Sequence, residues 1–323
     1  MTNRRSALLA LAALLAPLGA TAERPKRVAR IGYLSAGANP MRQLFREELR
    51  RLGYVEGRNV IVEYRSADGD FERLPGLAAE LVRLKVDVIV AQVTQASIAA
   101  KNATATIPIV MMGVSDPVAS GLVASLARPG GNVTGTSAVV SGVVGKQLEL
   151  VRELVPGVTR IAALWNPANR VFQQQQLGEA EAAAAELKLQ LRLIGARDPR
   201  AIEDAFESLA REPASALLVL GDPVFVTHAR QIAELALRQR LPTVSGTRSM
   251  ADAGALLTYG PRFDDAARGA AAYVDRILKG AKPAELPVER SARFELVVNA
   301  KTARALGIVL PQGLLLRADH VIE

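Results

Sequence analysis

Short polar side chains recur where apolar, strand-like runs of the sequence end. Ser35 follows the first run, Thr94 and Gln95 follow the third, and Asp116 follows the fourth. In parallel α/β sheets, small ligands bind beyond the carboxyl ends of the strands, where helix N-termini present free N–H groups. Hydroxyl, amide and carboxylate groups at that edge suit hydrogen bonding to a small polar molecule. The expected ligand-binding residues are Ser35, Thr94, Gln95, Asp116, Ser137, Asn166, Asp222 and Ser245.

A purely structural role competes with ligand binding at several of these positions. Asp116-Pro117 and Asp222-Pro223 each combine an N-cap residue with a proline at the first helical position, which stabilises a helix start without any ligand. Asn166-Pro167 has the same form. If the residues do bind a ligand, we expect one cleft in which one set faces the other. The first set is Ser35, Thr94 and Asp116, and the second is Asn166, Asp222 and Ser245.

The residue inventory argues against catalysis and against a metal site. The chain has two histidines, His228 and His320, and no cysteine, so it offers no HExxH motif, no His pair at ligand spacing and no thiolate. It has no G-x-S-x-G elbow and no phosphate-binding P-loop motif, and Gly32–Gly37 departs from G-x-G-x-x-G. Asp264-Asp265 lies at an apparent helix start, where N-capping explains it. We therefore expect no metal, no cofactor and no enzymatic activity.

Apolar runs alternate with amphipathic stretches along most of the chain. The stretch from Met41 to Leu52, for example, places Leu44, Phe45 and Leu49 on one helical face. Strands that alternate with helices predict parallel sheets covered on both faces, so the predicted class is α/β. The predicted strands are Val28–Leu34, Val60–Tyr64, Val86–Val90, Ile107–Met112, Arg160–Trp165, Gln190–Ile194, Ala216–Leu220 and Pro242–Ser245.

Eight such units exceed one comfortable open sheet, so we expect two lobes. Three irregular stretches, at 127–137, 246–260 and 281–289, are what a chain needs to cross three times between them. The predicted N-terminal lobe comprises 23–137 plus 255–285, and the predicted C-terminal lobe comprises 138–254 plus 286–323. From Phe294 onward the pattern predicts a strand, a short helix at Ala300–Leu306 and an extended tail.

The N-terminus has the three parts of a cleavable secretory signal, which we place at residues 1–22. Arg4 and Arg5 precede an apolar run from Ala7 to Ala20, and a small-x-small site follows before Glu23. The apolar run is shorter than the roughly 20 residues that a membrane span needs. Since the chain has no cysteine to carry a lipid, we expect a mature protein that is free in the periplasm.

The charge pattern gives no sign of a nucleic-acid partner. The formal net charge is +8, but the basic residues are scattered and sit near acidic ones, as in Arg46-Glu47-Glu48. No basic stripe with interleaved aromatic residues occurs, so nucleic-acid binding is not expected.

A long run from Asp116 to Gly135, DPVASGLVASLARPGGNVTG, resembles the signature of the ABC-transporter substrate-binding protein family that includes tryptophan-binding proteins. The similarity extends over essentially the whole chain after the signal. Other stretches that resemble the family are Ile31–Leu34, Phe45–Gly57, Ile107–Val110, Leu164–Pro167, Lys279–Val288 and Phe294–Ile308.

The resemblance implies a periplasmic-binding-protein type I fold, in which two Rossmann-like lobes joined by three crossovers hold one ligand in the cleft. It implies the solute-binding component of an ABC importer, which closes on its ligand and delivers it to a permease in the inner membrane. We expect a monomer. A ligand sensor for a membrane receptor and, further off, a hydrolase on the same scaffold are the alternatives.

Helix N-termini that face the cleft would suit a carboxylate group of the ligand. An amino acid or a related anion is therefore the leading ligand. An aromatic ligand would need stacking partners, for which Tyr33, Phe225 and Tyr259 are the candidates. The loop Gln92–Gln95 stands where relatives tend to have a small-residue Gly-Thr turn, so contacts do not transfer directly at that point.

Overall fold

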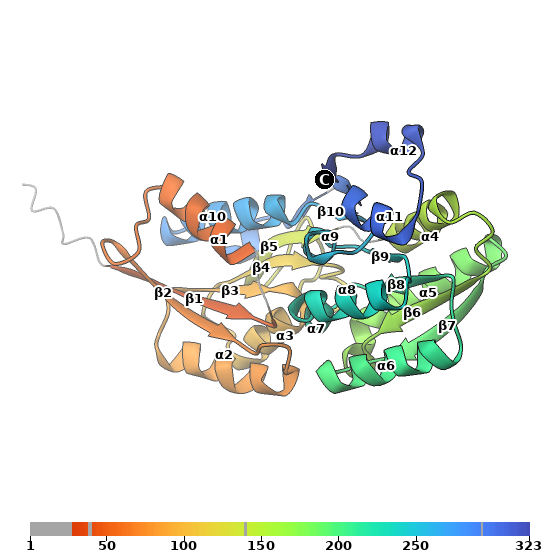
Figure 1. Ribbon diagram of the computed structural model, residues 1–323. Coiled ribbons are helices and arrows are strands. Elements are labelled where there is room, and N and C mark those ends of the chain that lie inside the picture. The colour runs from red at the N-terminus through yellow and green to blue at the C-terminus, as the bar shows by residue number, and fades with distance from the viewer. Residues whose placement is uncertain (1–27, 38–40, 139–140, 292) are drawn as a thin grey trace, which may run out of the picture.

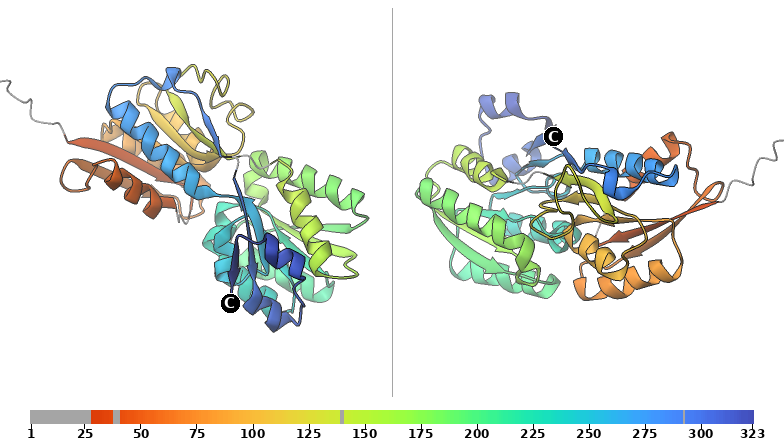
Figure 2. Two further views of the ribbon diagram at one scale, coloured as in Figure 1. Left: turned by 90° about the horizontal axis from the view of Figure 1, so that it is seen from above. Right: turned by 180° about the vertical axis from the view of Figure 1, so that it is seen from behind.

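The computed structural model describes residues 28–37, 41–138, 141–291 and 293–323, which form two lobes that lie side by side (Figures 1 and 2). The predicted signal peptide lies outside the described residues. The first lobe is built on a six-stranded sheet of order β11-β5-β4-β3-β1-β2, in which every neighbouring pair is parallel. Its strands are β1 (Ala29–Ser35), β2 (Val60–Ser66), β3 (Val88–Gln92), β4 (Ile109–Val114), β5 (Val133–Ala138) and β11 (Glu289–Ser291).

The second lobe is built on a seven-stranded sheet of order β13-β12-β10-β9-β8-β6-β7. All neighbours are parallel except β10 and β12, which run antiparallel. Its strands are β6 (Arg160–Trp165), β7 (Gln190–Gly195), β8 (Ala216–Val219), β9 (Thr243–Ser245), β10 (Leu257–Pro261), β12 (Phe294–Asn299) and β13 (His320–Ile322). The expected α/β class, with two lobes and parallel sheets, is confirmed.

Helices cover both faces of the first sheet, and apolar side chains of its central strands point to both faces. Along β3, Val88 and Val90 join the core under α1 (Met41–Arg51) and α10 (Phe263–Leu278). Their neighbours Ile89 and Ala91 join the opposite core, under α2 (Leu74–Arg83) and α3 (Val93–Ala103). Figure 1 shows these helix pairs above and below the sheet. This alternation of side chains is the period of two that a strand imposes.

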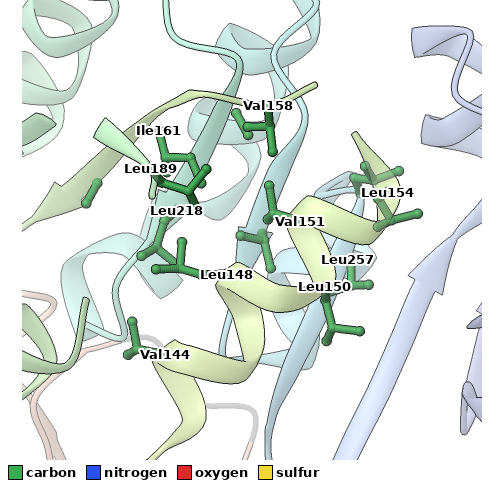
Figure 3. Close-up of a cluster of buried hydrophobic side chains, with 14 of the residues drawn as sticks. Val144, Leu148, Leu150, Val151, Leu154, Val158, Ile161, Leu189, Leu218 and Leu257 are labelled. Atoms are coloured by element: carbon green, nitrogen blue, oxygen red, sulfur yellow. The ribbon is translucent and has the colours of Figure 1, made fainter. Parts of the chain in front are cut away.

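The second sheet is covered in the same way. On one face lie α4 (Val143–Leu154), α5 (Arg170–Glu186), α11 (Ala300–Leu306) and α12 (Gln312–Arg317). Figure 3 shows Leu148 and Val151 of α4 packed against Ile161 and Leu218 of this core. On the other face lie α6 (Pro199–Arg211), α7 (Pro223–Thr227), α8 (Ala229–Arg238) and α9 (Arg248–Ala253).

The chain crosses between the lobes three times, as expected, but two crossings differ from the predicted boundaries. The first follows β5, the second lies between Pro261 of β10 and α10, and the third lies between β11 and β12. The assignment of 255–285 to the N-terminal lobe is wrong for β10, which pairs with β9 and β12. The assignment of 286–323 to the C-terminal lobe is wrong for β11, which pairs with β5.

The physical reason is that each irregular stretch contains or borders a strand that the sequence pattern hides. In β5 the residues VTGTSA are small and polar, and β10 ends in Gly-Pro, so neither gives an apolar run. Pairing to neighbours far away in the chain makes them strands. The predicted extended tail is wrong for the same reason, because α12 packs Leu314 into the core and β13 pairs with β12.

Helix α7 of the second lobe lies against the first lobe. A Cβ atom at Gly37 would lie 3.2 Å from the carbonyl oxygen of Pro223 and 3.1 Å from Oγ1 of Thr227. A Cβ at Gly69 would lie 3.4 Å from the side chain of Val224. Phe71 packs against the hydrophobic cores of both lobes. The two lobes therefore touch, at positions where glycines allow α7 to approach closely.

The substitution Gly37→Ala tests this contact. The added methyl group meets backbone of α7, and overpacking of this kind costs about 1–3 kcal/mol. Because only the form with touching lobes contains the clash, the cost should favour separation of the lobes. We expect a larger radius of gyration by small-angle X-ray scattering, with unfolding still cooperative.

The matched control is Gly131→Ala in the same lobe, where a Cβ meets nothing within 4 Å. This control should scatter as the unmodified protein does. A Gly37→Ala protein with an unchanged radius of gyration would show that α7 is not seated against the first lobe in solution.

Candidate functional site

A cavity of about 460 Å³ lies between the lobes. Its volume falls within the range of about 300–1,000 Å³ that is typical of small-molecule sites. It opens at the carboxyl ends of the strands in both sheets, the edge at which ligands bind in this class of fold. The first lobe contributes Met41, Leu44, Gln92, Thr94, Gln95 and Ser115 to the wall, and the second contributes Asp222, Val226, Thr247, Arg248, Glu295 and His320.

The first-lobe wall is dominated by the N-terminus of α3. The N-cap residue Gln92 makes no capping hydrogen bond with its side chain, so the N–H groups of the first turn keep their donor capacity. Thr94 in this turn is only 5% exposed and lines the cavity, yet no described residue hydrogen-bonds its hydroxyl group. This end of the cavity therefore presents donors for which the described residues supply no acceptor.

Gln92 adds a further donor to the same wall. Its Oε1 accepts a hydrogen bond from the hydroxyl of Ser35 at 2.7 Å, and Ser35 also lies 2.6 Å from the carbonyl oxygen of Gly37. Within the described residues, the Nε2 group of Gln92 has no protein acceptor. Ser35 does not line the cavity itself. Its hydroxyl group positions Gln92, which does.

The backbone at Val93 is in the left-handed region, with φ of 61°. This conformation is an outlier for a β-branched residue and costs of the order of 1–3 kcal/mol. Glycine is the residue that adopts this conformation freely. Val93 is the first residue of α3, and this strained turn lines the cavity.

Asp222 lies on the second-lobe wall and is 3% exposed. Its carboxylate accepts hydrogen bonds from Nδ2 of Asn169 at 2.7 Å, from Nδ2 of Asn166 at 3.0 Å and from the backbone N–H of Val224 at 2.9 Å. Burial raises the pKa of Asp222 above its ordinary value, and these three hydrogen bonds act in the opposite direction. The predicted N-cap role is therefore present, and Asp222 also lines the cavity.

A hydrogen bond between Gln95 and Asn169 joins the two walls. Gln95 lies in the first turn of α3, whereas Asn169 belongs to the short turn that follows β6 in the other lobe. Since Asn169 also donates to Asp222, two hydrogen bonds connect the donor-rich turn with the buried carboxylate. The two chemically opposite groups are therefore close neighbours across the cleft.

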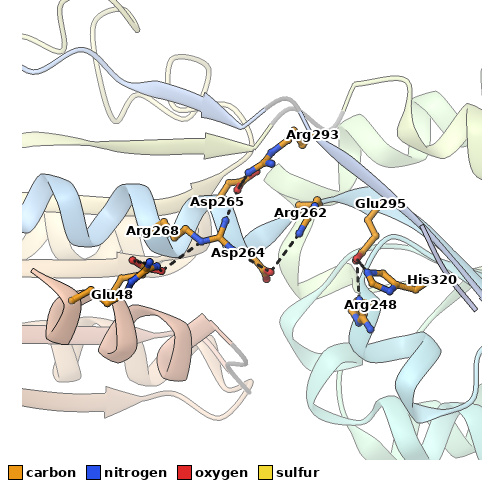
Figure 4. A network of polar contacts seen from close by, with 10 residues as sticks. Glu48, Arg248, Arg262, Asp264, Asp265, Arg268, Arg293, Glu295 and His320 are labelled. Carbon is orange, nitrogen blue, oxygen red and sulfur yellow. Dashed lines mark hydrogen bonds and ion pairs between the residues drawn. The ribbon is translucent and has the colours of Figure 1, made fainter. Parts of the chain in front are cut away.

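Charged residues line the rest of the cavity and the crossings beside it (Figure 4). Glu295 contacts both Arg248, at 3.0 Å, and His320, at 3.1 Å. At the second crossing, Arg262 lies 3.9 Å from Asp264. Next to it, Asp265 pairs with Arg293 of the third crossing. These ion pairs tie the crossing segments together beside the site.

The eight predicted ligand-binding residues fall into three groups. Thr94, Gln95 and Asp222 line the cavity. Ser35 and Asn166 support residues that line it, namely Gln92 and Asp222. The other three point elsewhere. The hydroxyl of Ser245 donates to the carbonyl of Val219, that of Ser137 donates to the carbonyl of Ser115, and Asp116 is exposed and caps its own turn.

The three aromatic candidates lie outside the cavity wall. Tyr33 and Phe225 are 1% exposed and belong to the cores of their lobes. Tyr259 stacks on Phe294, with ring centroids 5.6 Å apart. Sequence reasoning missed Arg248, Glu295 and His320, which reach the site from α9 and from the two final strands. The only indication in the sequence is that these residues lie at the beginnings of strands or of a helix.

No group of three or more metal-ligating side chains occurs within the part of the chain that the structure describes. In that same part, none of the helices is both long and apolar enough to cross a membrane.

Residues 36–322 match the family model described as "ABC transporter substrate binding protein". A tyrosine-binding protein of Clostridioides difficile (strain R20291) is 30% identical over 262 residues, which are 81% of this chain and 75% of that protein.

Two solved structures extend the comparison. An ABC domain from Streptococcus pneumoniae in complex with L-Trp has a TM-score of 0.83 and 26% identity, over 91% of this chain and 99% of that one. The ligand-free, open structure of a substrate binding protein with adhesive properties from Clostridium difficile has a TM-score of 0.64 and 27% identity, also over 91% and 99%. The described structure is thus more similar overall to the L-Trp complex than to the open structure. The family model and the similar proteins show that the chain belongs to the ABC transporter substrate-binding protein family.

Proposed function

We propose that this substrate-binding protein captures a free α-amino acid in the cleft and closes on it for delivery to a membrane permease. Family membership makes the chain the substrate-binding component of an ABC transporter. The same membership sets the hydrolase alternative aside, because the family binds its substrates without transforming them. The amino-acid ligand and the closure of the lobes go beyond family membership, and both are proposed from the site.

The observation that carries the proposal is the opposite polarity of the two facing walls. The α3 turn offers N–H groups without a side-chain cap and the hydroxyl of the largely buried Thr94, which suit a carboxylate. Asp222 offers a buried carboxylate, which suits an ammonium group. An amino acid carries both groups on one carbon atom, and Gln95 and Asn169 hold the two walls close together. The L-Trp and tyrosine of the relatives have this same head group.

Closure follows from the same geometry. A ligand that bonds Thr94 in one lobe and Asp222 in the other gains its full set of contacts only when the lobes approach. It therefore binds the closed form more tightly and shifts the population toward it. The contact between α7 and the first lobe stabilises the closed form even without a ligand.

The site of action follows from the N-terminal pattern rather than from the fold. Residues 1–22 have the composition of a cleavable export signal, and the chain has no cysteine for lipid attachment. We propose that the mature protein works as a monomer in the periplasm, beside a permease of the inner membrane. A role as a ligand sensor for a membrane receptor would use the same cleft.

Calorimetry with a panel of amino acids tests the proposed function. The panel contains tyrosine, tyramine, which lacks the carboxylate, and 3-(4-hydroxyphenyl)propionate, which lacks the ammonium group. We expect binding of amino acids and a large loss of affinity when either head group is removed. Equal affinity for tyrosine and both analogues, or no binding by any amino acid, would contradict the proposal.

Thr94→Val should weaken amino-acid binding strongly while the fold stays intact. The change keeps the shape but removes a hydrogen bond to a charged group, which costs about 1.5–3 kcal/mol, or roughly 10- to 150-fold in dissociation constant. Ser245→Ala is the matched control, because its hydroxyl bonds the carbonyl of Val219 behind the site. It should lower thermal stability and leave affinity unchanged. The reverse pattern, measured by calorimetry, would remove Thr94 from the site.

Asp222→Asn should selectively weaken ligands that carry an ammonium group. Asparagine keeps the N-cap of α7 through Oδ1, whereas the attraction to the ammonium group and the hydrogen bond from Asn169 are lost. For the unmodified protein, affinity should also fall as the pH is lowered through the raised pKa of Asp222, because the ammonium group prefers the ionised carboxylate.

That fall should begin above the ordinary aspartate pKa of about 3.9 and should be absent from Asp222→Asn. Titration calorimetry at several pH values measures both effects. If Asp222→Asn weakens tyrosine and its des-amino analogue equally, then Asp222 does not bind the ammonium group.

A further inference from the structure

The cavity has a second polar end, remote from Asp222. Asp222 follows β8, whereas Glu295 begins β12, and β9 and β10 lie between those two strands in the sheet. Glu295 pairs with Gly260 near the carboxyl end of β10, so both acidic residues lie along the same edge. At about 4.8 Å per strand, the two backbone positions are about 14 Å apart. A ligand whose head group lies at Asp222 therefore meets Glu295 with the far end of its side chain.

The side chains at this second end form a compact cluster of Arg248, Glu295 and His320. Nη1 of Arg248 donates to Oε1 of Glu295 at 3.0 Å, and Nε2 of His320 lies 3.1 Å from the same oxygen. Glu295 is largely buried, with 13% of its side chain exposed, although all three residues line the cavity. Among the described residues, none donates a hydrogen bond to Oε2. The carboxylate is thus fixed through one oxygen and keeps acceptor capacity on the other.

Charges of both signs surround this cluster, which restricts the group that it can receive. Arg248 is paired with Glu295 and lies 3.9 Å from Asp252, and Arg262 is paired with Asp264 nearby. A cationic side chain would meet the guanidinium groups, and an anionic one would meet the carboxylates. A neutral group that donates a hydrogen bond meets neither objection, since it satisfies the open acceptor on Glu295.

We propose that Arg248, Glu295 and His320 form a distal specificity subsite, which accepts a hydrogen bond from a neutral O–H or N–H at the far end of a long amino-acid side chain. This inference rests on the proposed function, because Asp222 and the α3 turn must hold the head group. Arg248 and His320 position the carboxylate of Glu295, and Glu295 contacts the ligand. The subsite selects for side-chain length and for a terminal donor together.

Two matched ligand pairs test the subsite on the unmodified protein by calorimetry. Tyrosine and phenylalanine differ by one hydroxyl group, and tryptophan and 1-methyltryptophan differ in the indole N–H donor. In at least one pair, the member that carries the donor should bind roughly tenfold tighter or more, because its partner leaves the Glu295 acceptor unsatisfied.

Glu295→Gln then tests the residue itself. The amide keeps the shape but weakens the acceptor, so the ratio within the discriminated pair should shrink several-fold while the affinity for the donor-free member stays unchanged. Asp252→Asn is the matched control, since its side chain is on the same rim and 56% exposed. It should leave the ratio as it is.

The outcomes separate the subsite from the proposed function. Equal affinities within both pairs, tight binding of short aliphatic amino acids alone, or an unchanged ratio in Glu295→Gln would each overturn the subsite and leave amino-acid capture standing. If the unmodified protein binds no amino acid, both proposals fail. If removal of either head group weakens binding but the ratios do not respond to Glu295→Gln, only the subsite is lost.

Discussion

A carboxylate buried between two lobes is the constraint on which the rest of the site depends. Asp222 cannot lie at 3% exposure without donors, and the chain supplies three of them from within the second lobe. One of the donors, Asn169, is held in turn by Gln95 of the first lobe. The carboxylate also caps α7, the helix that the first lobe contacts. Asp222 therefore takes part in the binding site, in the start of α7 and in the link between the lobes.

The opposing wall, from the first lobe, carries hydrogen-bond donors. Backbone N–H groups in the first turn of α3 and the hydroxyl of Thr94 are donors held away from bulk water. The turn that carries them begins with the left-handed backbone of Val93, between the buried strand β3 and the helix α3. Donors without a protein acceptor on one wall therefore lie opposite a carboxylate that its own lobe already holds with three hydrogen bonds.

The sequence was a good guide to the α/β class, the two lobes and the eight regular strands, because apolar runs of period two and helical faces are local properties. It misplaced two crossings, since β10 and β11 become strands through partners far away in the chain. At the site, the strand ends were identified correctly, but a strand end does not tell which way a side chain points. Ser245 and Ser137 turn toward backbone carbonyls, whereas Thr94 turns into the cavity. Glu295 and His320 escaped notice because only the order of strands in the folded sheet brings them to the same edge as Asp222.

Phe71 packs against the hydrophobic cores of both lobes, so the opening of the cleft depends on temperature. Opening the lobes must bring water to Phe71 and to the apolar side of α7 around Val224. Hydration of apolar surface raises the heat capacity and becomes less unfavourable on cooling. Closure should therefore carry a negative heat-capacity change beyond that of the ligand itself, and the open form should gain population in the cold. Water, as well as the ligand, sets how often this cleft is open.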